Sequence, residues 1–263
     1  MKKLIKKIFT SLFLAALCTA PPVNPMLHAG PLEDCAEYAK LGLPSEDGTL
    51  LCRTGYLLAH DSDFKTPIWV AEHLTREKVA EKLKRKDNFR PDPDLTPGNR
   101  SELADYKGSG FDRGHMAPSA DFGWSKEAMD ESFLLSNMAP QNSNNNRQIW
   151  AALEGLVRDW ATARGEVYIY TGPVYVDDKA EKRIGANQVG VPDLLFKVIY
   201  DPRKKEAIAF LLPNQATESN DLTPYIIPVR DIEYATGLNF LSKLTRKEQN
   251  RIEKVMPQMW ERQ

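Results

Sequence analysis

The sequence predicts an α+β fold with a mixed, mainly antiparallel sheet and packed helices. Strand-like and helix-like segments alternate irregularly along the 263 residues, without the strand–helix–strand rhythm of a parallel α/β sheet. Strand-like segments also occur in pairs joined by short polar turns, which is typical of antiparallel hairpins. The length and the 42% apolar content are enough for a sizeable core. One domain over residues 30–263 is the simplest division, with two small domains as the alternative.

The N-terminal half of this region begins with a hairpin and continues into a loop. Residues 55–60 and 67–75 are predicted strands, joined by the polar turn 61–65. A highly charged helix is predicted over 76–86. Residues 89–110 are rich in Pro, Asp, Gly and Ser and predict a long loop, and loops of this length in compact domains are often functional.

The middle of the chain predicts two helices. The first is short and covers 125–133, with Ser125 as its N-cap, and a brief strand or turn follows at 134–137. The clearest helix of the chain covers 145–164 and ends at Gly165.

The C-terminal part returns to strands. Residues 166–171 alternate as a strand, which Gly172-Pro173 stops. Residues 194–200 and 207–212 predict a second hairpin, and a last helix is predicted over 245–256.

The first 20 residues differ in composition from the rest of the chain. Four lysines, at positions 2, 3, 6 and 7, precede an apolar run at 8–20. This pattern predicts a secretory signal peptide, cleaved after Ala20 or as late as Ala29, and hence export to the periplasm or out of the cell. The apolar run is too short to span a bilayer, so no stable membrane insertion is expected. Lipidation at Cys18 is the alternative, although Leu17 fits that processing poorly.

Two cysteines remain once the leader is removed. Cys35 and Cys52 are too far apart for a CxxC redox motif. In an oxidising compartment we expect them to form a disulfide, and two free buried thiols are the alternative.

The charge balance is acidic without the leader. The whole chain has 35 basic and 36 acidic residues, and removing the four leader lysines leaves 31 basic against 36 acidic, a net charge of −5. A protein that binds polyanions is usually basic, so any such surface must be a local patch. One basic cluster fits, although a solvated charged face is the alternative for its first part. It comprises Lys82, Lys84, Arg85, Lys86, Arg90, Arg100, Lys107 and Arg113.

The run Asp112-Arg113-Gly114-His115 combines a guanidinium, a flexible turn and an imidazole. An arginine fork matches phosphate oxygens. A histidine titrates close enough to neutrality to act as a general base beside that phosphate. Four residues match by chance in many chains, so the weight of this motif depends on the residues that follow it.

The 145–164 helix has an apolar face with a polar line beside it. Asn146, Trp150, Glu154 and Arg158 recur at intervals of four, so each step advances about 40° around the helix. Polar groups at the edge of a buried face are partly desolvated and well oriented, as catalytic groups need to be. The alternative is an ordinary helix with a Glu154–Arg158 surface pair. The apolar face comprises Ile149, Leu153, Leu156, Val157 and Trp160.

Several ordered blocks of the sequence together resemble the DNA/RNA non-specific endonucleases, the endonuclease G-like ββα-metal nucleases. The blocks are residues 106–118, which contain the Asp112–His115 motif, residues 130–141, and the helix positions 146 and 150–154. Residues 171–175 also look like a later strand of that family. The resemblance covers roughly residues 55–212 and implies a ββα-metal catalytic motif within the α+β fold.

The resemblance implies a role for each matching residue. His115 matches the general base that activates water. Asn146 matches the single protein ligand of a divalent ion, and a lone ligand suits magnesium, which keeps most of its waters. Arg113 matches the arginine near the substrate phosphate.

The resemblance also implies roles for residues that assist these three. Asn137 matches an asparagine beside the catalytic histidine and the metal site, and Glu154 matches the acid that orients metal-bound water. Arg158 matches an arginine that stabilises the phosphate and the leaving group. A further substrate-contacting arginine of the family has no secure counterpart, and Arg85 and Arg90 are its candidates.

The implied function is an exported, metal-dependent endonuclease that hydrolyses DNA and RNA to 5′-phosphate ends. The expected ion is Mg²⁺, with Mn²⁺ or another divalent ion as alternatives, and the resemblance also suggests a homodimer. A catalytically inactive nucleic-acid-binding protein is one alternative function. A histidine zinc hydrolase is another, but His28, His60 and His73 lack metal-ligand spacing with His115.

Overall fold

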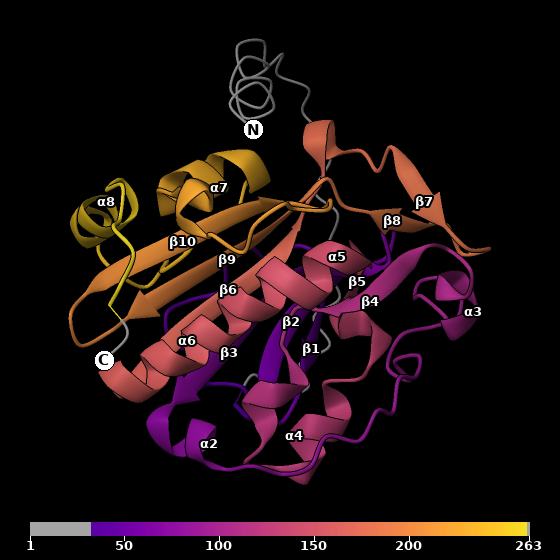
Figure 1. The fold of residues 1–263 in the computed structure, drawn as a ribbon, viewed down its shortest axis with the longest axis horizontal. Coiled ribbons are helices and arrows are strands. Elements are labelled where there is room, and N and C mark those ends of the chain that lie inside the picture. The colour runs from indigo at the N-terminus through magenta and orange to yellow at the C-terminus, as the bar shows by residue number, and fades with distance from the viewer. Residues whose placement is uncertain (1–32, 262–263) are drawn as a thin grey trace.

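The computed structural model describes residues 33–261, and its main element is a seven-stranded sheet (Figure 1). The strands are β1 (Thr49–Cys52), β2 (Tyr56–Asp61), β3 (Thr66–Thr75), β6 (Glu166–Val174), β9 (Leu194–Asp201), β10 (Glu206–Pro213) and β11 (Ile226–Ile227). They lie in the order β1-β2-β3-β6-β9-β10-β11, and every neighbouring pair is antiparallel. The predicted α+β fold with a mainly antiparallel sheet is confirmed.

Two separate ribbons stand beside the main sheet. One pairs β4 (Phe111–His115) with β5 (Met138–Asn142), and the other pairs β7 (Lys182–Ile184) with β8 (Val189–Val191). The helix that follows β5 completes a β–β–α unit with the first ribbon. Gly114 is required inside this unit, because a Cβ there would lie 2.0 Å from the side-chain Oε1 of Gln141 on β5.

The helices are mostly short, and α6 is the longest. The α-helices are α2 (Arg76–Ala80), α3 (Leu103–Tyr106), α4 (Lys126–Glu131), α5 (Ser143–Asn145), α6 (Ala151–Arg164), α7 (Val229–Thr236) and α8 (Arg246–Glu253). A π-helical turn, η3 (Asn146–Trp150), joins α5 to α6. Four 3₁₀ turns complete the set: η1 (Ser119–Phe122), η2 (Leu135–Asn137), η4 (Val176–Asp178) and η5 (Thr223–Tyr225).

A separate apolar core covers each face of the main sheet. α6 runs along one face (Figure 1), where its Leu153, Val157 and Trp160 pack against sheet residues that include Ile169 and Ile199. On the other face, α7 and α8 contribute to a second core around the sheet's aromatic side chains. The sheet therefore fixes the position of α6 and of the polar residues beside its apolar face.

The elements mostly match their predicted ranges, with four differences. The strand that was predicted to stop at Gly172-Pro173 continues through both residues to Val174, still paired with β9. The helix predicted over 76–86 ends at Ala80, because α2 buries no residue and the charged sequence after it has no face to pack. The helix predicted over 145–164 contains the π turn at its start. The loop over 89–110 includes α3 and is tied down by buried Asp92, whose carboxylate accepts two 2.8 Å hydrogen bonds from Arg53.

The expected cysteine pair forms. Cys35 and Cys52 are joined by a disulfide that ties the segment before β1 to that strand's last residue. The predicted signal peptide lies outside the described residues. Among residues 33–261, none of the helices has the length and apolar character needed to traverse a bilayer.

Candidate active site

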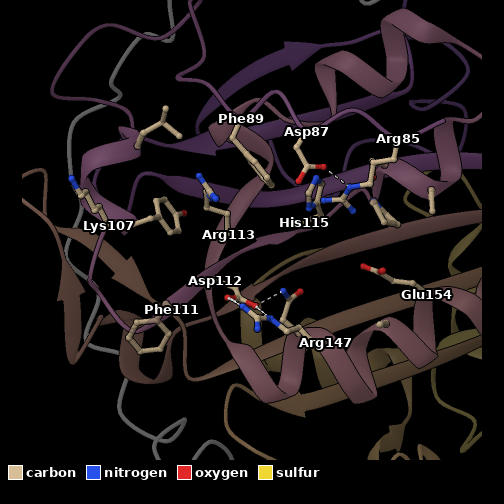
Figure 2. A pocket seen from close by; sticks show the side chains of 17 residues that line it. Arg85, Asp87, Phe89, Lys107, Phe111, Asp112, Arg113, His115, Arg147 and Glu154 are labelled. Carbon is tan, nitrogen blue, oxygen red and sulfur yellow. Dashed lines mark hydrogen bonds and ion pairs between the residues drawn. The ribbon is translucent and has the colours of Figure 1, made fainter. Parts of the chain in front are cut away.

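A cavity of ≈ 790 Å³ lies between β4 and the start of the long helix (Figure 2). Residues from five places in the sequence line it: the segment after α2, the loop before β4, β4 itself, the start of η1 and the η3–α6 helix. Most of the polar lining side chains are charged. The candidate residues among them are Arg85, Arg113, His115, Asn146 and Glu154.

His115 is the last residue of β4 and is 9% exposed. Its ring is held by packing, with the rings of Phe133 and Phe89 centred 5.2 Å and 5.4 Å away. Among the described residues, none forms a hydrogen bond with its Nε2, which is buried. Burial, and then the positive charge of Arg85, lower the pKa of His115 to about 3. The imidazole is therefore neutral at physiological pH and can accept a proton.

Asn146 faces His115's strand from the first turn of the π segment. Its Nδ2 donates a 2.9 Å hydrogen bond to the carboxylate of Asp112. Asp112 also accepts two 2.8 Å hydrogen bonds from the guanidinium of Arg147. Burial raises the pKa of Asp112, but the hydrogen bonds from Arg147 and Asn146 outweigh it and lower that pKa below its usual value. The ionised Asp112 thus fixes which end of the Asn146 amide is the donor, and no described residue hydrogen-bonds to the opposite Oδ1.

Glu154 lies two helical turns beyond Asn146 and lines the same cavity. Burial raises its pKa to about 7, although the nearby Lys197 opposes that shift. A carboxylate with this pKa exchanges protons near neutrality, as residues at reacting sites often do. In Figure 2 its carboxylate faces the same space as His115 and Arg147.

Two arginines supply positive charge to the cavity. The Arg113 guanidinium stacks 4.1 Å from the centre of the Phe89 ring. Arg85 lies next to His115 (Figure 2), where it pairs with Asp87 at 2.6 Å and remains 54% exposed. Both can therefore reach an anionic group placed beside the histidine.

Asn137 was expected beside the catalytic histidine and the metal site, and the structure places it next to the His115 strand end, where its backbone carbonyl accepts a 3.0 Å hydrogen bond from Met116 N. It is fully buried, and its side-chain amide is fully used by the backbone. Its Oδ1 accepts from Ala117 N, while its Nδ2 donates to the carbonyls of Ala117 and Ser132. Asn137 therefore holds the chain that leaves β4, and it does not line the cavity.

Arg158 and Arg90 also lie outside the cavity. Arg158 donates a 2.7 Å hydrogen bond to the buried carboxylate of Asp121, and its charge opposes the burial-raised pKa of the nearby Glu154. Arg90 pairs with Asp130 at 2.7 Å and ties its own loop to the end of α4. Of the two further arginine candidates, only Arg85 reaches the site.

The family model for DNA/RNA non-specific endonucleases matches residues 36–247. The chain belongs to this family. A nuclease of Syncephalastrum racemosum is 40% identical over 233 residues, which cover 80% of this chain and 73% of that protein. Human mitochondrial endonuclease G is 36% identical over 221 residues, which cover 79% of this chain and 74% of that protein.

A solved structure agrees with these sequence relatives. It is titled as the crystal structure of the EndoG/EndoGI complex, and it matches with a TM-score of 0.76 and 33% identity, covering 88% of this chain and 96% of that one. The chain is therefore a nuclease with the endonuclease G fold. Members of the family depend on a divalent metal ion in general.

The expectation of export is wrong. The relatives include human endonuclease G and nuclease 1 of Schizosaccharomyces pombe, both named as mitochondrial proteins. A basic N-terminal segment is shared by secretory and organelle-targeting sequences, so the lysines of the leader could not distinguish the two.

The prediction from sequence missed two groups at this endonuclease's site. Arg147 directly follows Asn146, but nothing in the sequence indicates that it pairs with Asp112 across 35 positions. Glu72 and Lys197 lie buried beneath the site on β3 and β9. A charged residue inside an otherwise apolar strand was the available signal for both of them.

Proposed function

We propose that this chain is a divalent-metal-dependent endonuclease that hydrolyses DNA and RNA to 5′-phosphate ends, with His115 as the general base and Asn146 as the metal ligand. The observation that carries this proposal is the neutral imidazole of His115 placed in one cavity with the oriented amide of Asn146. The expected alternative, a binding protein without catalysis, has no need of a histidine whose pKa is lowered to about 3.

The cavity's residues fit a hard cation such as Mg²⁺. No cluster of three or more His, Cys, Asp or Glu side chains with metal-binding geometry occurs in residues 33–261, which disfavours a zinc site. Mg²⁺ needs few protein ligands, because water and phosphate oxygens complete its shell. The Oδ1 of Asn146 is such a ligand, since Asp112 holds the Nδ2 away from it. When bound, the ion would neutralise charge on the phosphoryl and leaving oxygens.

The protein's own groups supply the remaining steps. His115 takes a proton from the attacking water, because its neutral ring has no competing partner at Nε2. Arg113 and Arg85 hold the scissile phosphate against the histidine through charge-assisted hydrogen bonds. Glu154, when ionised, can accept hydrogen bonds from water in the cavity and so orient it. The charged side chains that line the cavity suit contacts to phosphates, so sequence preference would be low.

The decisive experiment is plasmid cleavage by the purified protein with Mg²⁺. We expect nicking and then linearisation, and an uncut plasmid that still binds the protein would favour the binding-protein alternative. Mn²⁺ and Ca²⁺ in parallel reactions identify the ions that support turnover. Single-stranded, double-stranded and RNA substrates measure the breadth of the activity.

Two substitutions test the roles. His115→Ala is expected to lower kcat by at least about 10³-fold while DNA binding and the melting temperature stay near wild type. Asn146→Ala is expected to raise the Mg²⁺ concentration needed for half-maximal rate. An unchanged magnesium titration in the second variant would remove Asn146 from the metal site.

Two further aspects of the assembly are proposed. Residues 30–263 would act as one endonuclease domain, supported by the shared core in which α6 and the β4–β5 ribbon pack against one face of the main sheet. The chain would form a homodimer, which light scattering on the purified protein tests directly.

A further inference from the structure

A lysine is buried in the centre of the main sheet, directly beneath the candidate active site. Lys197 lies on β9 and is 2% exposed. Its Nζ donates a 2.6 Å hydrogen bond to Oγ1 of Thr171 on the neighbouring strand and lies 3.4 Å from the backbone carbonyl of Met116. Burying an ammonium is costly, and an apolar side chain would fill this part of the core at lower cost.

The contacts of Lys197 reach both walls of the cavity. Met116 is the residue after His115, so the hydrogen bond to its carbonyl holds the end of the histidine strand. The Nζ also lies 5.1 Å from the ring centre of Trp150, which is fully buried. Trp150 is one helical turn after Asn146 and one before Glu154. A single side chain thus contacts the general base's strand and the helix that carries the other two site residues.

An acidic residue lies on the same face of the sheet, although it forms no direct ion pair with Lys197 among the described residues. Thr171 is paired with both Lys197 and Val70, and Glu72 lies two residues beyond Val70, so all of these side chains point toward α6. Glu72 is 2% exposed, and neither of its carboxylate oxygens has a hydrogen-bond partner among the described residues. Burial lowers the pKa of Lys197, and Glu72, Glu154 and Asp121 oppose that shift.

We propose that Lys197 is a positioning residue for catalysis: it sets the distance between His115 and the Asn146–Glu154 side of the helix, while Glu72 balances its charge. The inference rests on the proposed function, because it assigns Lys197 a role in that reaction. The alternative is a purely structural charge pair whose loss affects folding alone. The two explanations predict different kcat values for a variant in which both Lys197 and Glu72 are replaced by uncharged residues.

The test compares Lys197→Met with the double variant Lys197→Met/Glu72→Gln in Mg²⁺-dependent cleavage of a defined duplex. The single variant removes the ammonium that opposes the burial-raised pKa of Glu72, and is expected to lower Tm by several degrees. The double variant removes both charges and is expected to recover most of that Tm. We expect kcat to stay about 100-fold below wild type in both, with KM within about threefold, because misplacement of reacting groups by about 1 Å has that effect.

Two control variants separate position from stability and surface charge. Phe240→Leu loosens the core on the opposite face of the sheet, where Phe240 is fully buried against Phe196, and should lower Tm while keeping kcat. Lys204→Met removes an exposed lysine in the turn after β9 and should change neither.

Three outcomes decide the matter. Wild-type kcat in the double variant, or a kcat loss no larger than that of Phe240→Leu at the same Tm, would overturn the positioning role and leave the nuclease function intact. Failure of the wild-type protein to cut would overturn the proposed function and this inference together. Low kcat with recovered Tm and nearly unchanged KM supports the role of Lys197.

Discussion

The two faces of the main sheet are built from the same strands but differ in chemistry. Toward α6, the central strands present Glu72, Thr171 and Lys197 among apolar neighbours. Toward α7 and α8, the alternate residues of the same strands are apolar or aromatic, including Trp69 and Phe196. Successive side chains of a strand point to opposite faces, so one sheet can support two unlike layers.

The difference indicates that the two faces have different roles. The apolar face contributes stability, because burial of large side chains is the main favourable term in folding. The charged face carries groups that cost stability unless they are paired. Because these charged groups lie beneath His115, Asn146 and Glu154, we infer that they serve the candidate active site. Four predictions test this contrast, from the largest expected free-energy effect to the smallest.

The largest effect is expected on the apolar face. Trp69→Ala removes a fully buried indole and should lower the free energy of unfolding by about 3–5 kcal/mol. Urea denaturation measures that loss, while kcat per folded molecule should stay near wild type below the new transition. A kcat loss above about tenfold under those conditions would show that the two faces are not separable.

The next effect concerns Glu154 and pH. With a pKa of about 7, Glu154 is protonated below neutrality, whereas His115 with a pKa of about 3 stays neutral throughout that range. The rate should therefore fall as pH drops through about 7, because the Glu154 carboxylate is lost. Glu154→Gln should lower kcat/KM about 100-fold and flatten this acidic limb. An identical limb in the variant would assign the titration to another group.

A smaller effect is expected from the residue that orients Asn146. Asp112→Ala releases the Asn146 amide and should raise the half-saturating Mg²⁺ concentration about tenfold, as loss of an outer-shell partner does in other metal sites. Arg147→Ala is the matched control, because this arginine is 69% exposed and its ion pair contributes little. Equal shifts in both variants would show that the ion pair, and not the hydrogen bond to Asn146, sets metal affinity.

The smallest effect distinguishes two arginines of one segment. Arg85→Ala should raise KM about three- to tenfold and reduce its salt dependence, since Arg85 lines the cavity. Arg90→Ala should leave KM unchanged and lower Tm slightly, since Arg90 pairs with Asp130. Cleavage assays over a salt series measure both. A raised KM in Arg90→Ala with an unchanged KM in Arg85→Ala would indicate that the substrate binds near α4 instead.

Most of the regular structure was predictable because local patterns encode it. The two strand-like segments 55–60 and 67–75, joined by a polar turn, predicted β2 and β3, and the apolar stripe of 145–164 predicted α6. The helix over 76–86 was predicted too long, because charge pattern alone does not show whether a helix has a surface to pack against. The two-residue strand β11 has too few residues to show any period.

The candidate site was predictable only in part. His115, Arg113, Asn146 and Glu154 were found through their motif and spacing, and the structure gathers them around one cavity. Asn137 and Arg158 share those motifs, yet their side chains are taken up by the backbone at Ala117 and by Asp121. Which way a polar side chain turns depends on partners 20 or more residues away, which no local pattern specifies.

The sequence by itself determined the α+β class, the order of the principal strands and helices, and the family. These follow from composition, periodicity and motifs, which are local properties of the chain. Only the tertiary structure decided that Asp112 orients Asn146, that burial keeps His115 neutral, and that Lys197 lies beneath both walls of the site. These depend on distances and desolvation between residues that are remote in sequence, and both arise only when the chain has folded.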